Sequence, residues 1–125
     1  GDPSFIAVTG GSAGAHLATL VALTANRPEL QPGFAAEDTS VAACVPFYGV
    51  YDFLDREQVR NDRGKMTEWL HANVMPCEPR GDPQLWDVAS PLAQVHERAP
   101  PFLVLHGTYD SLAKVEEARL FALRL

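Results

Sequence analysis

Short apolar runs alternate with longer helical patterns along the 125 residues of the chain. The run 5–9 (Phe-Ile-Ala-Val-Thr) lies between Pro3 and a glycine pair, and it predicts a buried strand. Residues 12–26 are rich in alanine and leucine and are apolar almost all the way round, which predicts a helix that is buried on most sides. This helix should end before Pro28, because the residue that precedes a proline is driven out of the α region.

Two further apolar runs follow. The run 41–48 predicts a strand covered on both faces, although Pro46 interrupts it near its C-terminal end. The run 102–106 predicts a third strand. After Lys114, apolar residues recur at helical spacing and leave Glu116, Glu117 and Arg124 off the apolar face. The residues of that face are Val115, Ala118, Phe121, Ala122 and Leu125.

This order of strand, helix, strand, irregular excursion, strand and helix predicts an α/β fold, in which helices pack on a parallel sheet. Three strands leave at least one apolar edge that requires neighbours. We therefore expect a piece of a larger α/β domain, in which exposed sheet edges could self-associate.

Composition and charge argue against several classes of function. Lys plus Arg number 10 and Asp plus Glu number 16, so the net charge is −6, which argues against nucleic acid as a partner. No apolar run approaches the roughly 18 residues of a transmembrane segment. The acidic residues and the four histidines lack the spacing of a metal site.

Cys44 and Cys77 form no disulfide framework, and Cys44 is expected to be a buried thiol. The start of the chain lacks the features of a signal peptide, which favours the cytoplasm and leaves export open.

The sequence Gly-Gly-Ser-Ala-Gly at 10–14 matches the motif G-x-S-x-G, and it stands directly after a predicted strand and directly before a predicted helix. In such a nucleophile elbow the chain reverses sharply, and Gly10 and Gly14 would supply positions where a Cβ does not fit. The turn would present Ser12 Oγ above the end of the sheet. It would also leave the Ala13 N–H free at the helix start as a candidate oxyanion donor. The alternative is a glycine-rich turn that only permits close packing.

The same glycine-rich segment offers a second interpretation, as a dinucleotide-binding turn. Residues 9–14 resemble the glycine-rich opening of short-chain dehydrogenases, but that pattern requires a further glycine where this chain has His16. Neither Tyr51 nor Tyr109 is followed four places later by the lysine of the Tyr-x-x-x-Lys motif. The sequence therefore disfavours a nucleotide cofactor.

A second group of polar residues, His-Gly-Thr-Tyr-Asp at 106–110, follows the third predicted strand. The carboxyl ends of parallel strands are where α/β sheets gather ligands and catalytic groups. Asp110 could orient an imidazole and stabilise its protonated form. It could equally cap the turn that follows it.

Four segments together resemble the hormone-sensitive-lipase-like branch of the α/β-hydrolase superfamily, close to bacterial carboxylesterases. They occur in the family's order at 10–18, 46–52, 90–92 and 100–112. The resemblance implies a serine esterase or lipase that acts on small-molecule esters through an acyl-enzyme, without a metal or an organic cofactor. It also implies Ser12 as the nucleophile, the Ala13 N–H as an oxyanion donor and Asp110 as the triad acid.

Two parts of the family pattern are not found in residues 1–125. The His-Gly-Gly-Gly loop that completes the oxyanion hole would precede Gly1, and the catalytic histidine would follow Asp110. We therefore expect residues 1–125 to run from the nucleophile strand to the helix after the acid-bearing strand, and to hydrolyse esters poorly by themselves. Peptidase or amidase activity and a non-catalytic ligand-binding module of the same fold remain alternatives.

The four histidines in the chain are expected to serve other purposes. His16 should project along its helix, and His106 should organise its own loop. His71 and His96 should be solvated or should cap backbone groups. The large apolar residues of the excursion are expected to form a satellite core, and the alternative is an acyl pocket or lid. These residues are Met66, Trp69, Leu70, Met75 and Trp86.

Overall fold

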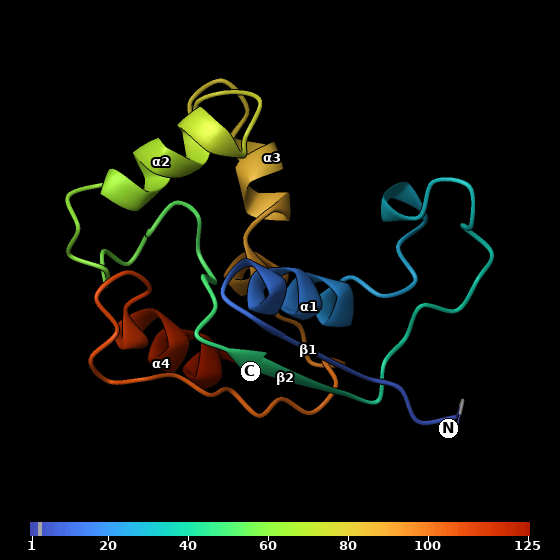
Figure 1. Cartoon of the computed structure of the whole chain (residues 1–125). Helices are drawn as coiled ribbons and strands as arrows, with labels where there is room; N and C mark the ends of the chain where they lie inside the picture. The colour runs from blue at the N-terminus through green and yellow to red at the C-terminus, as the bar shows by residue number, and fades with distance from the viewer. Residues whose placement is uncertain (3) are drawn as a thin grey trace.

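The computed structural model describes residues 1–2 and 4–125, so the predicted strand boundary at Pro3 lies outside the described residues. It confirms the predicted α/β class, with parallel strands and packed helices (Figure 1). The elements are β1 (Ala7–Gly11), α1 (Ala13–Leu23), η1 (Pro28–Leu30), β2 (Ala43–Phe47), α2 (Lys65–Asn73), α3 (Pro83–Val88), η2 (Pro91–Gln94) and α4 (Val115–Arg124).

Strands β1 and β2 pair in parallel, from Ala7 opposite Ala43 to Gly11 opposite Phe47. The third predicted strand, 102–106, joins β2 only through isolated parallel bridges. The cause lies in β2, because Pro46 has no N–H and cannot donate the ladder hydrogen bond between those that flank it. The flanking bonds are present: the amides of residues 103 and 105 donate to the carbonyls of residues 44 and 46, both at 3.0 Å.

One face of the sheet carries the core. Val8, Cys44 and Phe102 point to this face, where they pack against α1, and Phe102 also contacts α4. On the other face of β2, Phe47 is exposed and Ala43 and Val45 are only half-buried. The prediction that the strand at 41–48 is covered on both faces is therefore wrong for the described residues. An apolar run shows that a strand is apolar on both sides, but it does not show which neighbours cover each side.

The prediction that the first helix is buried on most sides is confirmed for α1. Its side toward the sheet is buried, including Ala18 and Ala22, and His16 stacks on Phe53 of the excursion. The exposed positions of α1 lie on one stripe, which includes Leu17 and Val21. In α4 the predicted core positions Val115, Ala118 and Phe121 are buried, whereas Ala122 and Leu125 are exposed.

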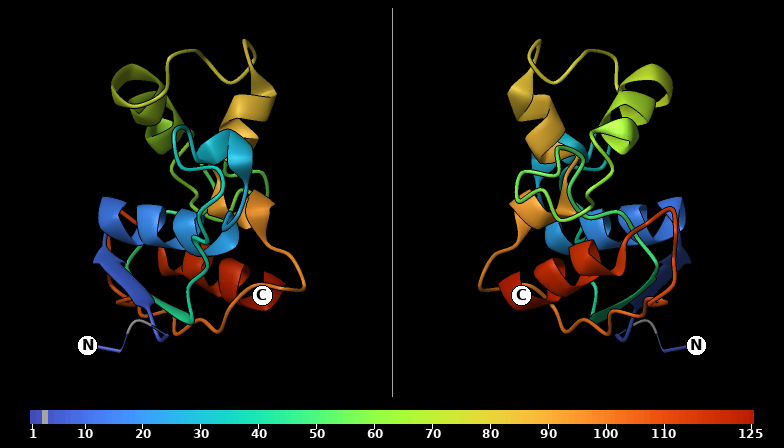
Figure 2. Two further views of the ribbon diagram at one scale, coloured as in Figure 1. Left: turned by 90° about the vertical axis from the view of Figure 1, so that its right-hand side faces the viewer. Right: turned by 90° about the vertical axis from the view of Figure 1, so that its left-hand side faces the viewer.

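The excursion between β2 and α4 forms its own layer, with α2 and α3 on the side of α1 that faces away from the strands (Figures 1 and 2). Phe53, Leu70 and Trp86 make a satellite core there, as predicted, while Trp69 is exposed. Asp82 caps the N-terminus of α3, because its carboxylate accepts the N–H of Leu85 at 3.0 Å.

A buried ion pair joins the excursion to α4. Arg60 and Glu117 are 2% and 1% exposed, and the Arg60 guanidinium lies 3.5 Å from the Glu117 carboxylate. Glu117 also accepts the N–H groups of Tyr51 and Asp52, and Arg60 donates to the carbonyl of Asp52 at 2.5 Å. Glu117 therefore lies off the apolar face of α4, as its spacing indicates, but it is buried. Helical periodicity identifies the side of α4 that faces the sheet, but the excursion covers a second side of the helix.

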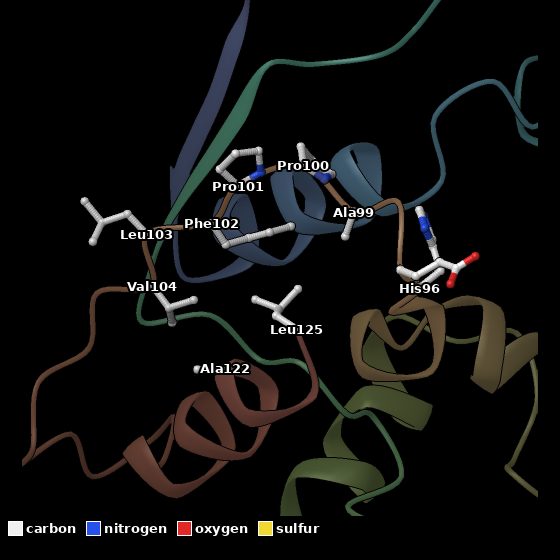
Figure 3. Close-up of a pocket in the computed structure, with 10 residues that line it drawn as sticks. His96, Ala99, Pro100, Pro101, Phe102, Leu103, Val104, Ala122 and Leu125 are labelled. Atoms are coloured by element: carbon white, nitrogen blue, oxygen red, sulfur yellow. The ribbon is translucent and has the colours of Figure 1, made fainter.

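A cavity of about 480 Å³ opens beside the outer edge of the third run (Figure 3). Phe102, Val104 and Leu125 line it together with His96, and none of the residues around it belongs to the turn at 10–14 or to the loop at 107–112. Over the described ranges, no helix is sufficiently long and apolar to cross a bilayer.

Burial raises the pKa of Glu117 from 4.5 to about 7, and the Arg60 charge only partly opposes this shift. The folded state therefore holds this proton more tightly than the unfolded state. The stabilisation is complete below about pH 4.5 and is lost as the pH rises through about 7. We expect the free energy of unfolding to fall by about 3 kcal/mol across this window. Urea unfolding at several pH values measures it. Glu117→Gln should make the free energy of unfolding nearly independent of pH in this range, whereas Glu116→Gln, at an exposed neighbour, should leave the pH dependence unchanged. Equal pH dependence in the wild type and both variants would contradict the role of Glu117.

Arg60→Ala should lower the free energy of unfolding by about 3–5 kcal/mol, because it leaves the Glu117 carboxylate buried without its partner. It also removes the donors to the carbonyls of Asp52 and Phe53. The comparison is with Arg98→Ala, which truncates an exposed arginine and should change the value by less than about 0.5 kcal/mol. Chemical denaturation of the two variants side by side decides the point, and similar losses in both would rule out the proposed role of the ion pair.

Candidate functional site

Ser12 lies at the turn between β1 and α1 with an unusual backbone conformation, φ 54° and ψ −120°. Such angles are costly for a residue with a side chain and persist only when the surrounding structure imposes them. The Ser12 N–H donates to the carbonyl of Phe47 at 3.0 Å, and its own carbonyl accepts the N–H of His16 at 3.1 Å. Ser12 is exposed and precedes the first residue of α1, so its hydroxyl stands at the rim of the sheet and not within a regular helix.

The glycines around Ser12 differ in what surrounds them. A Cβ on Gly10 would lie 2.4 Å from the carbonyl carbon and oxygen of Gly14, so no side chain fits there. A Cβ on Gly14 itself would meet no described atom within 4 Å. The crowding expected at Gly14 occurs instead at Gly11, where a Cβ would lie 2.6 Å from the hydroxyl oxygen of Tyr48.

Ala13 is the first residue of α1, and its N–H therefore has no intrahelical acceptor. The residue is exposed. The positive end of the helix dipole lies at the same place, so this N–H can stabilise negative charge that develops beside Ser12.

Asp110 follows the third run and holds its own loop. One carboxylate oxygen, Oδ1, accepts the N–H groups of Leu112 and Ala113 at 2.9 and 3.0 Å, which is the capping role considered for it. The other oxygen, Oδ2, makes no hydrogen bond with the described residues and lies 3.6 Å from Nε2 of His106. That nitrogen lies 2.7 Å from the carbonyl oxygen of Ala113, so His106 also organises the loop, as predicted.

The elbow and the acid-bearing loop lie at the same edge of the sheet. The carbonyl of Phe47, the last residue of β2, accepts the hydrogen bond from the Ser12 N–H. The next residue, Tyr48, donates its N–H to the carbonyl of Leu105 at 2.8 Å. The ends of β1, β2 and the third run are thus joined in sequence across one edge. In Figure 1 both turns lie toward the left-hand end of the strands.

Three of the four histidines are engaged in contacts with backbone carbonyl groups, and the fourth, His71, is exposed on α2. Nδ1 of His16 lies 2.8 Å from the carbonyl oxygen of Val50, and its ring stacks on Phe53 with the ring centroids 4.5 Å apart. Burial lowers the pKa of His16 and favours its neutral form. His96 contacts the carbonyl oxygen of Leu23 at 3.1 Å. Among the described residues, no imidazole is hydrogen-bonded to Ser12.

Other reactive groups do not gather at this edge. Across residues 1–2 and 4–125, no three His, Cys, Asp or Glu side chains come together as metal ligands. Cys44 is buried, and desolvation raises the pKa of its thiol to about 11, so it stays a neutral thiol.

Sequence reasoning missed the contact between Gly11 and Tyr48. The motif leaves position 11 free, and the left-handed backbone of Tyr48, with φ 43°, has no signature in the residue type. The glycine pair at 10–11 was the only available hint, since a second glycine beside the elbow is more than the motif requires.

Comparison with known proteins identifies related esterases. The esterase LipQ and the probable carboxylic ester hydrolase LipM, both of Mycobacterium tuberculosis, are 48% and 49% identical to the chain. The matches cover 100% and 97% of the chain but only 29% and 28% of those proteins, so the chain spans less than a third of their length.

The esterase Est2 of Thermogutta terrifontis, solved in a propionate-bound form, is 31% identical and superposes with a TM-score of 0.67, covering 98% of the chain and 40% of that structure. A family model described as BD-FAE matches residues 1–125 in full. The chain therefore belongs to the BD-FAE family, a hormone-sensitive-lipase-like family of α/β-hydrolases.

Proposed function

We propose that the protein to which these residues belong is a serine carboxylester hydrolase that acts through an acyl-enzyme on Ser12. The observation that carries the proposal is the strained, exposed turn at Ser12 between β1 and α1, on the sheet edge that also bears the loop of Asp110. The esterase names of LipQ and LipM support the same reaction class.

In this mechanism Ser12 Oγ attacks the ester carbonyl carbon and forms the new C–O bond while an imidazole takes its proton. Negative charge collects on the former carbonyl oxygen, where the Ala13 N–H and the positive end of α1 stabilise it. The bond to the alcohol then breaks, and the alcohol leaves with the proton. Water then attacks the acyl carbon while the imidazole takes a proton from it. The bond between the acyl carbon and Ser12 Oγ breaks, the carboxylic acid leaves, and the imidazole returns the proton to Oγ.

Asp110 would hold the imidazole in this scheme. Its Oδ1 is fixed by two backbone N–H groups, which leaves Oδ2 available to accept an imidazole N–H. The proposal requires an imidazole from outside residues 1–125, because His16 and His106 are bound to backbone carbonyl groups. Without such a base the Ser12 hydroxyl stays protonated at neutral pH and is a weak nucleophile.

The substrates we propose are small esters with short acyl groups. The propionate bound to the related Est2 supports an acyl group of this size. No metal ion is needed for the steps above, because each of them uses only proton transfer, a nucleophile and backbone dipoles.

Ser12→Ala in the intact protein should abolish the turnover of p-nitrophenyl propionate and the labelling by a fluorophosphonate. Asp110→Asn should lower kcat by about 10⁴-fold, since a neutral amide cannot hold the required tautomer of the imidazole. Ser40→Ala, at an exposed serine in a distant loop, is the control that should keep full activity. Ester binding without fluorophosphonate labelling would favour a non-catalytic module, and faster turnover of amides than of matched esters would favour an amidase.

The isolated 125-residue chain should turn over the same ester at least about 10³-fold more slowly than the intact protein, because it lacks the general base. Initial rates of the two proteins at equal concentration measure this, with circular dichroism to show that the short chain is folded. Normal turnover by the folded short chain would refute the requirement for an external imidazole.

A further inference from the structure

Tyr48 stands beside the elbow, at the end of β2. Its backbone is left-handed, with φ 43°, and its N–H is bound to the carbonyl of Leu105 at 2.8 Å. The hydroxyl oxygen, Cζ and Cε2 of its side chain lie 2.6, 2.9 and 3.3 Å from the place that a Cβ on Gly11 would occupy. The ring therefore covers the residue that immediately precedes Ser12.

The conformation of Ser12 must be imposed by its surroundings, since its backbone angles are unfavourable for a residue with a side chain. One restraint is the hydrogen bond from Ser12 to Phe47, and another is the contact between Gly10 and Gly14. The Tyr48 side chain occupies the space where a Cβ at position 11 would lie, so a larger residue at this position would displace the ring.

We propose that Tyr48 is a positioning residue for the nucleophile, which holds the Gly11–Ser12 backbone through its ring and fixes it relative to the acid-bearing run. The link runs from the Leu105 carbonyl to the Tyr48 N–H, and from the Tyr48 ring to Gly11. The proposal rests on the proposed role of Ser12 as the nucleophile. It gives Gly11, which the motif leaves unspecified, a definite function.

The ring and not the hydroxyl carries this role. The hydroxyl oxygen lies nearest to the Cβ position of Gly11, at 2.6 Å, but Cζ and Cε2 lie 2.9 and 3.3 Å from it, so a ring without the hydroxyl still occupies this space. Removal of the hydroxyl should therefore matter little. Displacement of the ring, either by its truncation or by a methyl group added at Gly11, should let the Ser12 backbone relax away from the reactive geometry.

The test is a double-mutant cycle in the intact protein. Tyr48→Ala and Gly11→Ala should each lower kcat for p-nitrophenyl propionate and the fluorophosphonate labelling rate about tenfold, with KM changed less than about twofold. The pair together should also lose only about tenfold, because the added methyl meets no ring once Tyr48 is truncated. Tyr48→Phe should keep nearly wild-type rates. Phe34→Ala is the matched control, since Phe34 is 47% and Tyr48 46% exposed.

Wild-type kinetics in Gly11→Ala would overturn the proposal. A loss of about a hundredfold in kcat for the double variant would also overturn it, because that is the result expected if the two substitutions act independently. Should Tyr48→Ala fail to fold, Tyr48→Leu with and without Gly11→Ala provides the same cycle. The two hypotheses fail differently: wild-type protein that is not labelled at Ser12 refutes the nucleophile, whereas normal labelling in all the Tyr48 and Gly11 variants refutes only the positioning role.

Discussion

The site depends on one steric constraint, the contact between the backbone of Gly10 and that of Gly14. The end of β1 and the first turn of α1 approach so closely that a Cβ at position 10 would lie 2.4 Å from the Gly14 carbonyl. This closeness makes the reversal sharp, and the sharp reversal moves Ser12 to angles that an ordinary turn would avoid. It also places the exposed hydroxyl next to the free N–H groups of a helix start. A wider turn would separate the hydroxyl from these donors.

The strain at Ser12 is maintained by the ends of the neighbouring strands. Ser12 is bound to Phe47, and Tyr48 is bound to Leu105, so three consecutive strand ends restrain one another across the sheet edge. Two of the residues in this series, Ser12 and Tyr48, have a positive φ although they are not glycine. Strained conformations of this kind cluster where a structure fixes the position of a reactive group. The third run pairs irregularly with β2 because Pro46 has no N–H to donate to the ladder. The missing hydrogen bond lies before the ends of the strands, so the bonds that join the strand ends are still formed.

The sequence was sufficient for those features that depend on local pattern. The apolar runs located β1 to within two residues and contained β2, although Phe5 and Ile6 are exposed and the run 102–106 forms only isolated bridges. The G-x-S-x-G motif between a strand and a helix located Ser12 and Gly10, because the motif marks the positions where this turn requires a close approach. It was not sufficient where two distant segments meet. Leu17 and Val21 are apolar but exposed, whereas Glu117 is charged but buried, and neither residue type nor helical spacing predicts these outcomes. The contact of Tyr48 with Gly11 could not be predicted either, because it depends on a left-handed backbone that most tyrosines do not adopt.

The buried pair of Arg60 and Glu117 fixes the long excursion between β2 and α4 to the rest of the fold. Burying two charges costs several kcal/mol per ion, and their attraction recovers this only when additional hydrogen bonds satisfy the remaining donors and acceptors. Here Glu117 accepts two backbone N–H groups at the start of the excursion, and Arg60 binds two backbone carbonyls of the same turn. These directional bonds define one arrangement of the excursion on α4, which an apolar contact of similar size would not do. Because α4 begins five residues after Asp110, the same bonds connect the excursion to the helix that anchors the acid-bearing loop.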